Sequence, residues 1–169
     1  MFQTKILTAS IAILALGSVA HADDQGNWQE VSGTGIHFES EGLEHSLEPT
    51  NSGFVRTSTD IVELSGDLVG RALFQPVSVI NLVEGTILNT GSQVFSGTVL
   101  GSEPVVIHDD RFRFDIDLNT GQTTGDIFLT DNVSGPIVRC ILQMQGTGRT
   151  VEGYNLSIYW GKCKLNNTQ

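Results

Sequence analysis

The stretch RFRFDIDLNTGQTTGDIFLT, residues 111–130, decides the fold class that the sequence predicts. Its opening part, RFRFDIDL, alternates strictly between apolar and charged side chains, and this period of two is typical of a strand with one buried face. The apolar face carries Phe112, Phe114, Ile116 and Leu118. Turn residues follow at 119–121, and residues 122–130 run back with Ile127 and Leu129 on one face. The stretch therefore predicts an antiparallel hairpin.

The rest of the chain repeats this pattern. Turn signals recur about every ten residues, as they do in β-sandwiches and β-barrels, and no convincing helix follows residue 22. Segments 77–88 and 154–160 are apolar on both faces, which favours a barrel whose outside is covered as well, for example in a homo-oligomer. We predict an all-β fold, an antiparallel closed or nearly closed barrel of about eight strands. A two-sheet β-sandwich is the alternative.

The local patterns also place the individual strands and loops. We expect strands at residues 28–38, 55–64, 67–74, 77–88, 93–100, 105–107, 138–145 and 154–163. Pro76 would stand just before its strand, where a missing N–H is tolerated. Turns are predicted at 89–91 and 101–104, and residues 39–53 form an acidic surface loop.

The first 22 residues resemble a cleaved signal peptide. Lys5 gives a basic start, residues 6–19 are apolar or small, and Ala20-His21-Ala22 fits the rule for signal peptidase. The apolar run is short for a membrane span, so an uncleaved anchor is the weaker alternative. We predict export to the periplasm or the medium, in a layout typical of bacteria. After residues 1–22 we expect three parts: an N-terminal strand and acidic loop at 23–53, a barrel at 54–163, and a polar tail at 164–169.

The charge of the chain excludes some classes of partner. The sequence carries a formal net charge of −10 and has no basic stripe, so nucleic-acid binding is excluded. Anionic lipid surfaces are disfavoured for the same reason. No stable membrane span is expected once the signal peptide is removed.

The chain contains two cysteines, Cys140 and Cys163. An even pair in an exported chain predicts a disulfide, and the two residues would lie opposite each other in a hairpin of segments 138–145 and 154–163. The chain-entropy model assigns a loop of this size about 3 kcal/mol of stabilisation. A metal site or a catalytic thiol is the alternative, but no CxxC motif or nearby histidine supports it.

None of the remaining polar clusters identifies a catalytic residue, a metal site or a cofactor site. Asp115, Asp117, Asn119 and Asp126 are spaced like calcium ligands, yet Thr120 stands where a calcium loop needs glycine, and a solvated strand face explains them better.

The segment His108-Asp109-Asp110 is the densest polar cluster. It would suit a metal or acid–base chemistry, but a loop between strands also accounts for it. The nucleophile elbow, the dinucleotide fingerprint and the P-loop are absent.

Some polar residues interrupt otherwise apolar faces. Asn81 lies between Val79 and Val83 in the sequence pattern, while Glu84 and Arg139 also sit among apolar neighbours. Inside a barrel these groups would need a partner or a polar ligand, whereas outside they would be ordinary surface residues. The pattern alone leaves both possibilities open.

Two glycine-rich segments carry a family resemblance. LSGDLVG at 64–70 and QVFSGTVLG at 93–101, with Gly146-Thr-Gly148 before the last strand, resemble the allene oxide cyclase and dirigent group of small calycin-like barrels over residues 54–163. The resemblance implies an eight-stranded antiparallel barrel, often oligomeric, with an apolar pocket at one mouth. It also implies cyclisation or coupling of hydrophobic substrates without a cofactor. No catalytic motif of that group aligns with this chain.

These observations support three hypotheses. The first is an exported barrel that binds a small hydrophobic or amphipathic molecule, with Asn81 and Arg139 as polar anchors. Its apolar lining would come from Phe112, Phe114, Ile116 and Leu118. The second is a cofactor-free cyclase or isomerase that uses an acid or base such as Glu84 or His108. The third is an interaction module with a filled interior that presents its acidic face to a partner.

Overall fold

The computed structural model describes residues 27–166, and the predicted signal peptide lies outside this range. The described chain consists almost entirely of strands. They are β1 (Trp28–His37), β2 (Leu43–Pro49), β3 (Gly53–Gly66), β4 (Leu68–Asn81), β5 (Thr86–Val99), β6 (Val105–Asp117), β7 (Thr123–Leu129), β8 (Asp131–Ser134), β9 (Ile137–Arg149) and β10 (Asn155–Asn166). The single described helix is a short 3-10 turn, η1 (Glu39–Glu41).

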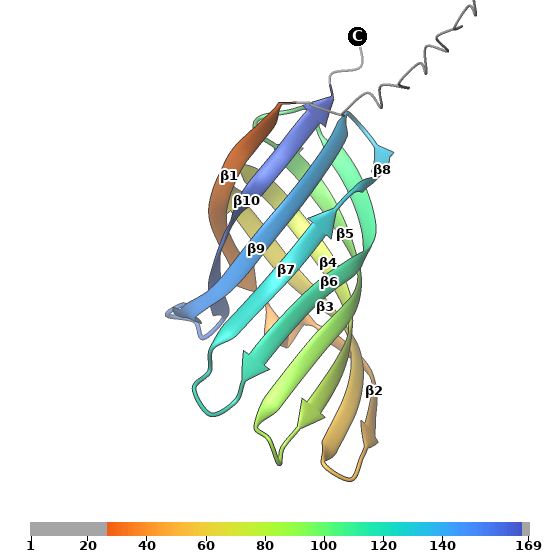
Figure 1. Ribbon diagram of the computed structural model, residues 1–169, viewed down its shortest axis with the longest axis vertical. Coiled ribbons are helices and arrows are strands. Elements are labelled where there is room, and N and C mark those ends of the chain that lie inside the picture. The colour runs from red at the N-terminus through yellow and green to blue at the C-terminus, as the bar shows by residue number, and fades with distance from the viewer. Residues whose placement is uncertain (1–26, 167–169) are drawn as a thin grey trace, which may run out of the picture.

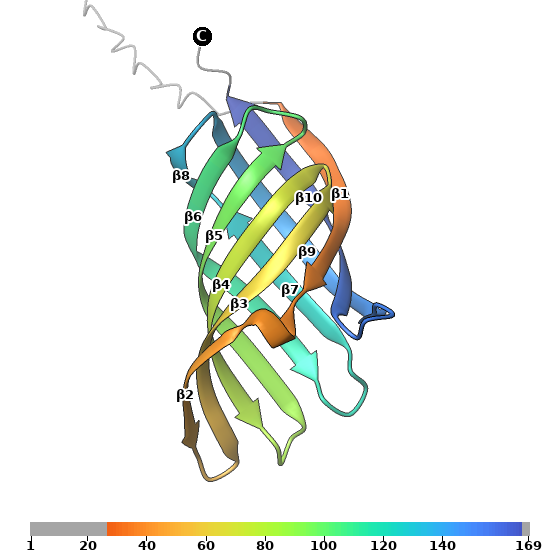
Figure 2. The same cartoon turned by 180° about the vertical axis from the view of Figure 1, so that it is seen from behind.

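The strands close into a barrel (Figure 1). The sheet runs in the order β1-β10-β9-β7-β6-β5-β4-β3, all pairs are antiparallel, and β1 returns to pair with β3. Figure 2 shows the closing strand β1 from behind, with β2 continuing along the outer part of β3. The short strand β8 pairs with β6. The predicted closed antiparallel barrel is therefore confirmed, and the two-sheet sandwich is not formed.

One end of the barrel is filled with side chains. The most completely buried large residues there are Leu68, Phe95, Ile107, Leu129, Leu142 and Tyr159. The Tyr159 hydroxyl accepts a hydrogen bond from the Leu68 amide at 2.8 Å and reaches the Leu68 carbonyl oxygen at 3.4 Å. A Cβ at Gly33 would lie 2.0 Å from the Ser65 carbonyl oxygen and 2.4 Å from this hydroxyl, so only glycine lets β1 approach β3 here.

The predicted disulfide also lies at this filled end. Cys140 on β9 and Cys163 on β10 are direct register partners and are joined by a disulfide bond. Both side chains are completely buried. The prediction from the sequence is confirmed, and its hairpin argument holds because β9 and β10 are the arms expected at 138–145 and 154–163.

A bulge in β6 changes the side of the sheet to which its residues point. Gln93 pairs with Asp109 and Gly91 pairs with Phe112, so β6 contains one more residue than β5 over this interval. Before the bulge odd-numbered residues of β6 face inward, and after it even-numbered residues do, as β-bulges dictate. The expected loop at 108–110 is therefore wrong: these residues lie within the continuous strand β6.

Several further boundaries differ from the expectations. The predicted strand 77–88 is divided, because β4 ends at Asn81 and β5 begins at Thr86, and the predicted turn at 89–91 lies inside β5. Pro76 lies within β4, and the pairing of β4 with β3 is interrupted there because proline has no N–H to donate. The predicted acidic loop at 39–53 contains η1 and β2, and β10 extends into the predicted tail as far as Asn166.

Candidate functional site

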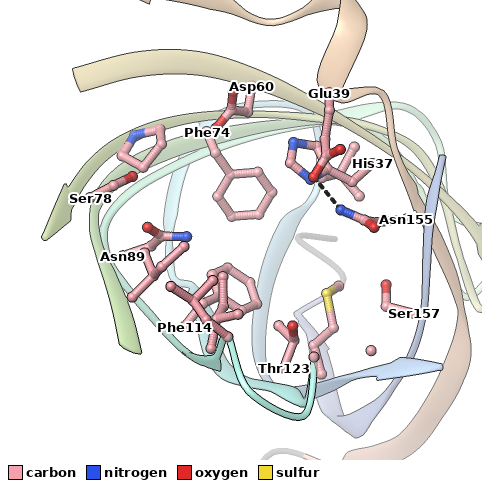
Figure 3. Close-up of a pocket in the computed structure, with 18 of the residues that line it drawn as sticks. His37, Glu39, Asp60, Phe74, Ser78, Asn89, Phe114, Thr123, Asn155 and Ser157 are labelled. Carbon is pink, nitrogen blue, oxygen red and sulfur yellow. Dashed lines mark hydrogen bonds between the residues drawn. The ribbon is translucent and has the colours of Figure 1, made fainter. Parts of the chain in front are cut away.

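The end of the barrel away from the disulfide contains a cavity of ≈ 490 Å³ (Figure 3). The β2–β3 and β4–β5 hairpins project beyond the rest of the barrel on this side (Figure 1). Aromatic and aliphatic side chains form most of the cavity wall. They include Phe74, Ile80, Ile87, Phe112, Phe114 and Met144. Five charged residues also line it: Glu39, Arg56, Asp60, Asp117 and Arg149. The cavity therefore combines a largely apolar wall with charged positions.

Three phenylalanines form the wall of the cavity that adjoins the filled core. The Phe74 ring packs edge-on against Phe112 at 5.0 Å and Phe114 at 5.8 Å between centroids, a geometry favoured by aromatic quadrupoles. A Cβ at Gly125 would lie 2.0 Å from Phe114, so the ring lies directly over this glycine. Phe112 and Phe114 thus face the cavity, as the alternation of the sequence predicted, with Ile116 and Leu118 in the same wall.

Polar atoms without partners are the distinctive feature of this chamber. His37, at the end of β1, and Asn89, within β5, both line it. The His37 Nε2 and Asn89 Oδ1 atoms are buried, and within residues 27–166 neither forms a hydrogen bond. Leaving a buried polar atom unpaired costs about 1–3 kcal/mol, so each of these two positions lowers the stability of the fold.

A third unpaired atom, Gln93 Oε1, belongs to the structural core instead. The Gln93 amide nitrogen donates to the Phe128 carbonyl oxygen at 2.9 Å and approaches the Arg111 carbonyl oxygen at 3.4 Å. Beside it, Asp109 accepts hydrogen bonds from the Arg111 amide at 2.9 Å and from the Thr130 hydroxyl. These hydrogen bonds pair backbone groups around the β6 bulge. Neither Gln93 nor Asp109 lines the cavity.

The electrostatic surroundings of His37 set its protonation state. Burial lowers the pKa of His37 below its ordinary value of 6.5, and Arg56 acts in the same direction. The carboxylates of Asp60 and Glu39 oppose this effect but do not overcome it. The imidazole is consequently neutral at pH 7, with carboxylates close by that favour its protonated form.

The residues around His37 are held by their own contacts. Asp60 is 8% exposed and accepts a hydrogen bond from the Ser58 hydroxyl at 3.1 Å, with an Arg56 nitrogen 3.7 Å away. Glu39 accepts a hydrogen bond from the Asn155 amide, which connects η1 to β10 beside the cavity mouth. The two carboxylates near the imidazole are therefore held by different contacts, Asp60 within β3 and Glu39 against β10.

The polar residues singled out from the sequence do not line this cavity. Asn81 lies at the end of β4, where its side-chain oxygen accepts hydrogen bonds from the Val83 and Glu84 amides at 3.1 Å and closes the turn. Glu84 is exposed in that turn, and Arg139 is exposed on the outer face of β9. The interior position considered for these side chains is corrected accordingly. His108, the other acid–base candidate, is exposed on β6.

The acidic cluster at the β6–β7 turn has a structural role. Asp115 forms a bidentate ion pair with Arg113, both distances being 2.7 Å, and Asp117 accepts hydrogen bonds from the Asn119 and Thr120 amides. The hydrogen bond and charge of Arg113 lower the pKa of Asp115. Across residues 27–166, no cluster of three or more His, Cys, Asp or Glu side chains has an arrangement suited to a metal ion.

His37 and Asn89 were missed by the sequence analysis for identifiable reasons. His37 falls in the region with the weakest pattern, although it is in phase with Val31 and Gly35, which β1 turns inward. Asn89 was assigned to a turn because Asn-Thr-Gly is typical of turns. With the observed bounds of β5, its phase with Phe95 and Gln93 would have placed it inside.

Comparison with known proteins adds no relative. No family model matches the chain, and neither a curated protein nor a solved structure is significantly similar to it. Among residues 27–166, no helix has the length and apolar character needed to cross a membrane. The resemblance to the allene oxide cyclase and dirigent group stays a prediction.

Proposed function

We propose that this protein is an exported β-barrel that binds a small, mostly apolar molecule with a polar group in its interior. The observation that carries the proposal is the chamber itself, whose wall combines aromatic and aliphatic side chains with polar residues such as His37 and Asn89. A volume of ≈ 490 Å³ lies within the range of small-molecule sites, about 300–1,000 Å³. An apolar ligand bearing a polar group would fill the chamber and contact both kinds of side chain in its wall.

Other observations support the export and the open interior. A disulfide accords with an oxidising compartment, and the signal-like residues 1–22 point the same way. The hypothesis of an interaction module expected a filled interior, which the cavity end does not have. The outer face of β4 exposes a row of apolar side chains, and its coverage by a second copy stays a prediction. The row consists of Val69, Leu73, Val77 and Val79.

The test uses a neutral apolar fluorescent dye, Nile red, titrated into the purified protein from residue 23 onward. We expect saturable binding with enhanced fluorescence. Ser78, which is 4% exposed and lines the cavity, is changed to Phe, and Ser96, exposed on β5, is changed to Phe as the matched control. S78F should weaken binding about tenfold or more, since a ring would occupy the chamber, and S96F should not.

Circular dichroism and thermal unfolding establish that both variants are folded before the titration. If the folded wild-type protein takes up no dye, the proposal is wrong. It is also wrong if S78F and S96F bind the dye as well as the wild-type protein does, because the dye would then lie outside the barrel.

A further inference from the structure

We propose that the polar group of the ligand is an organic ammonium, which the chamber holds between the Asp60 carboxylate and the rings of its three phenylalanines. This inference rests on the proposed ligand-binding function and assigns the charge class of that ligand. Primary amines and quaternary ammonium groups on an apolar body share this chemistry.

Asp60 brings a negative charge into the chamber wall. It faces inward from β3, in phase with Ser58 and Val62, and it lines the cavity. The Ser58 hydroxyl donates a hydrogen bond to the Asp60 Oδ2 atom at 3.1 Å, so the carboxylate is held in place. The Asp60 side chain keeps 12% of its surface accessible, so its neighbours do not seal it off from a ligand.

Asp60 borders the aromatic cluster of the cavity. Asp60 on β3 and Phe74 on β4 are direct register partners, and both face inward. The Cβ atoms of such partners lie about 4.5–5.5 Å apart. Figure 3 shows the Phe74 ring inside the ring of strands, next to Asp60. Since Phe74 also packs against Phe112 and Phe114, a carboxylate and three clustered rings share one part of the wall.

This combination of groups suits an ammonium ion. The face of an aromatic ring attracts cations, and clusters of rings are the usual recognition site for quaternary ammonium groups. A carboxylate beside the rings adds a direct Coulomb attraction, which is stronger in a partly buried site than in bulk water. The apolar body of the ligand would then fill the rest of the chamber against Ile80, Ile87 and Met144.

The two arginines of the wall are already engaged by carboxylates. Arg56 lies 3.2 Å from Glu44 and 3.7 Å from Asp60, so two acidic groups share its charge. Arg149 lies 3.8 Å from Glu39. An anionic ligand would have to compete with these carboxylates for either guanidinium, whereas a cationic ligand would meet no such competition at the aromatic rings.

The electrostatic field at the wall also has the sign that a cation needs. Burial lowers the pKa of His37, but among the charges acting on this imidazole Asp60 is the strongest and Glu39 the second, and both raise its pKa. Arg56 acts in the opposite direction and is weaker. The formal net charge of −10 for the whole chain adds to the attraction of positive ligands.

Three ligands with one apolar body test the charge class. They are 4-phenylbutylamine, 4-phenylbutan-1-ol and 4-phenylbutanoate, which are cationic, neutral and anionic at pH 7, and each is titrated against the Nile red complex at low salt. We expect the amine to displace the dye about tenfold more tightly than the alcohol, and the anion to be the weakest. Sodium chloride at about 0.5 M should reduce the advantage of the amine and leave the alcohol unchanged.

Matched variants assign the preference to the proposed groups. D60N should reduce the advantage of the amine over the alcohol to about twofold or less, because it removes the charge and keeps the size of the side chain. D126N removes the same charge from an exposed position on β7 and should keep the advantage. F114L should lower the advantage about threefold, since leucine is apolar but has no ring face. Circular dichroism establishes that each variant is folded.

The outcomes separate this inference from the proposed function. If the alcohol or the anion displaces Nile red as well as the amine does, the ammonium inference is overturned and ligand binding stands. It is also overturned if folded D60N keeps the full advantage of the amine. The wild-type series decides the charge class even where a variant does not fold. If Nile red does not bind to the folded protein, both proposals fail together.

Discussion

Replacing Tyr159 by Phe should weaken the barrel through one hydrogen-bonded group. The Tyr159 hydroxyl is buried, with the side chain 1% exposed, and it accepts the Leu68 N–H at 2.8 Å where β4 begins. Removing it leaves that amide unpaired in the filled core, which costs about 1–3 kcal/mol of unfolding free energy. For a domain of this size the loss corresponds to a fall in Tm of about 4–12 °C.

The assay is urea and thermal unfolding, with Tyr154→Phe as the control. Tyr154 is the other tyrosine of the chain; its ring packs edge-on against Phe38 at 4.8 Å, and the residue is half-buried outside the filled core. Y154F should therefore stay within about 0.5 kcal/mol of the wild-type protein. The reasoning is refuted if Y159F unfolds at the wild-type urea midpoint with an unchanged m-value, or if Y154F loses as much stability as Y159F.

Two further predictions concern the disulfide and the pH dependence of stability. Replacing Cys140 and Cys163 together by Ala should lower the unfolding free energy in urea by about 3 kcal/mol, because the bond closes a loop with a sequence separation of 23; unchanged stability would contradict this. Burial lowers the pKa of His37, so the unfolded state binds more protons below pH 6.5 and stability should fall as the pH drops from 6.5 through the lower pKa of the folded protein. H37Q should lose less Tm than the wild-type protein over this range, and equal slopes would show that His37 does not contribute.

The two ends of the barrel differ in how completely side chains fill them. The filled end holds the disulfide, the Tyr159–Leu68 bonds and the most deeply buried side chains. The open end leaves Phe74 and Phe114 facing a chamber in place of other side chains. Preorganised sites need a rigid support, and here the packed half supplies it through the same continuous strands.

Unpaired polar atoms occur both in the chamber wall and in the filled core. His37 and Asn89 each keep an unpaired buried polar atom, which lowers stability, and so does Gln93 in the filled core. Gln93 and Asp109 are equally polar, but most of their atoms are bonded around the β6 bulge. Unpaired atoms therefore occur at both ends of the barrel and do not by themselves mark ligand-facing positions.

The sequence by itself determined the all-β class, the inward face of Phe112 and Phe114, and the Cys140–Cys163 bond. Each of these follows from local periodicity or from hairpin register, which act over a few residues and are read directly from side-chain alternation.

Only the tertiary structure decided which polar residues meet inside the ring. His37 and Asn89 belong to β1 and β5, far apart in sequence, and the closure of β1 onto β3 brings them to one chamber. Local sequence patterns also could not predict the strand bounds around Pro76 or the bulge in β6, because each depends on the register of a neighbouring strand. A shift of one residue in the pairing of two strands turns the opposite face of a strand inward, and this register is fixed only when the barrel closes.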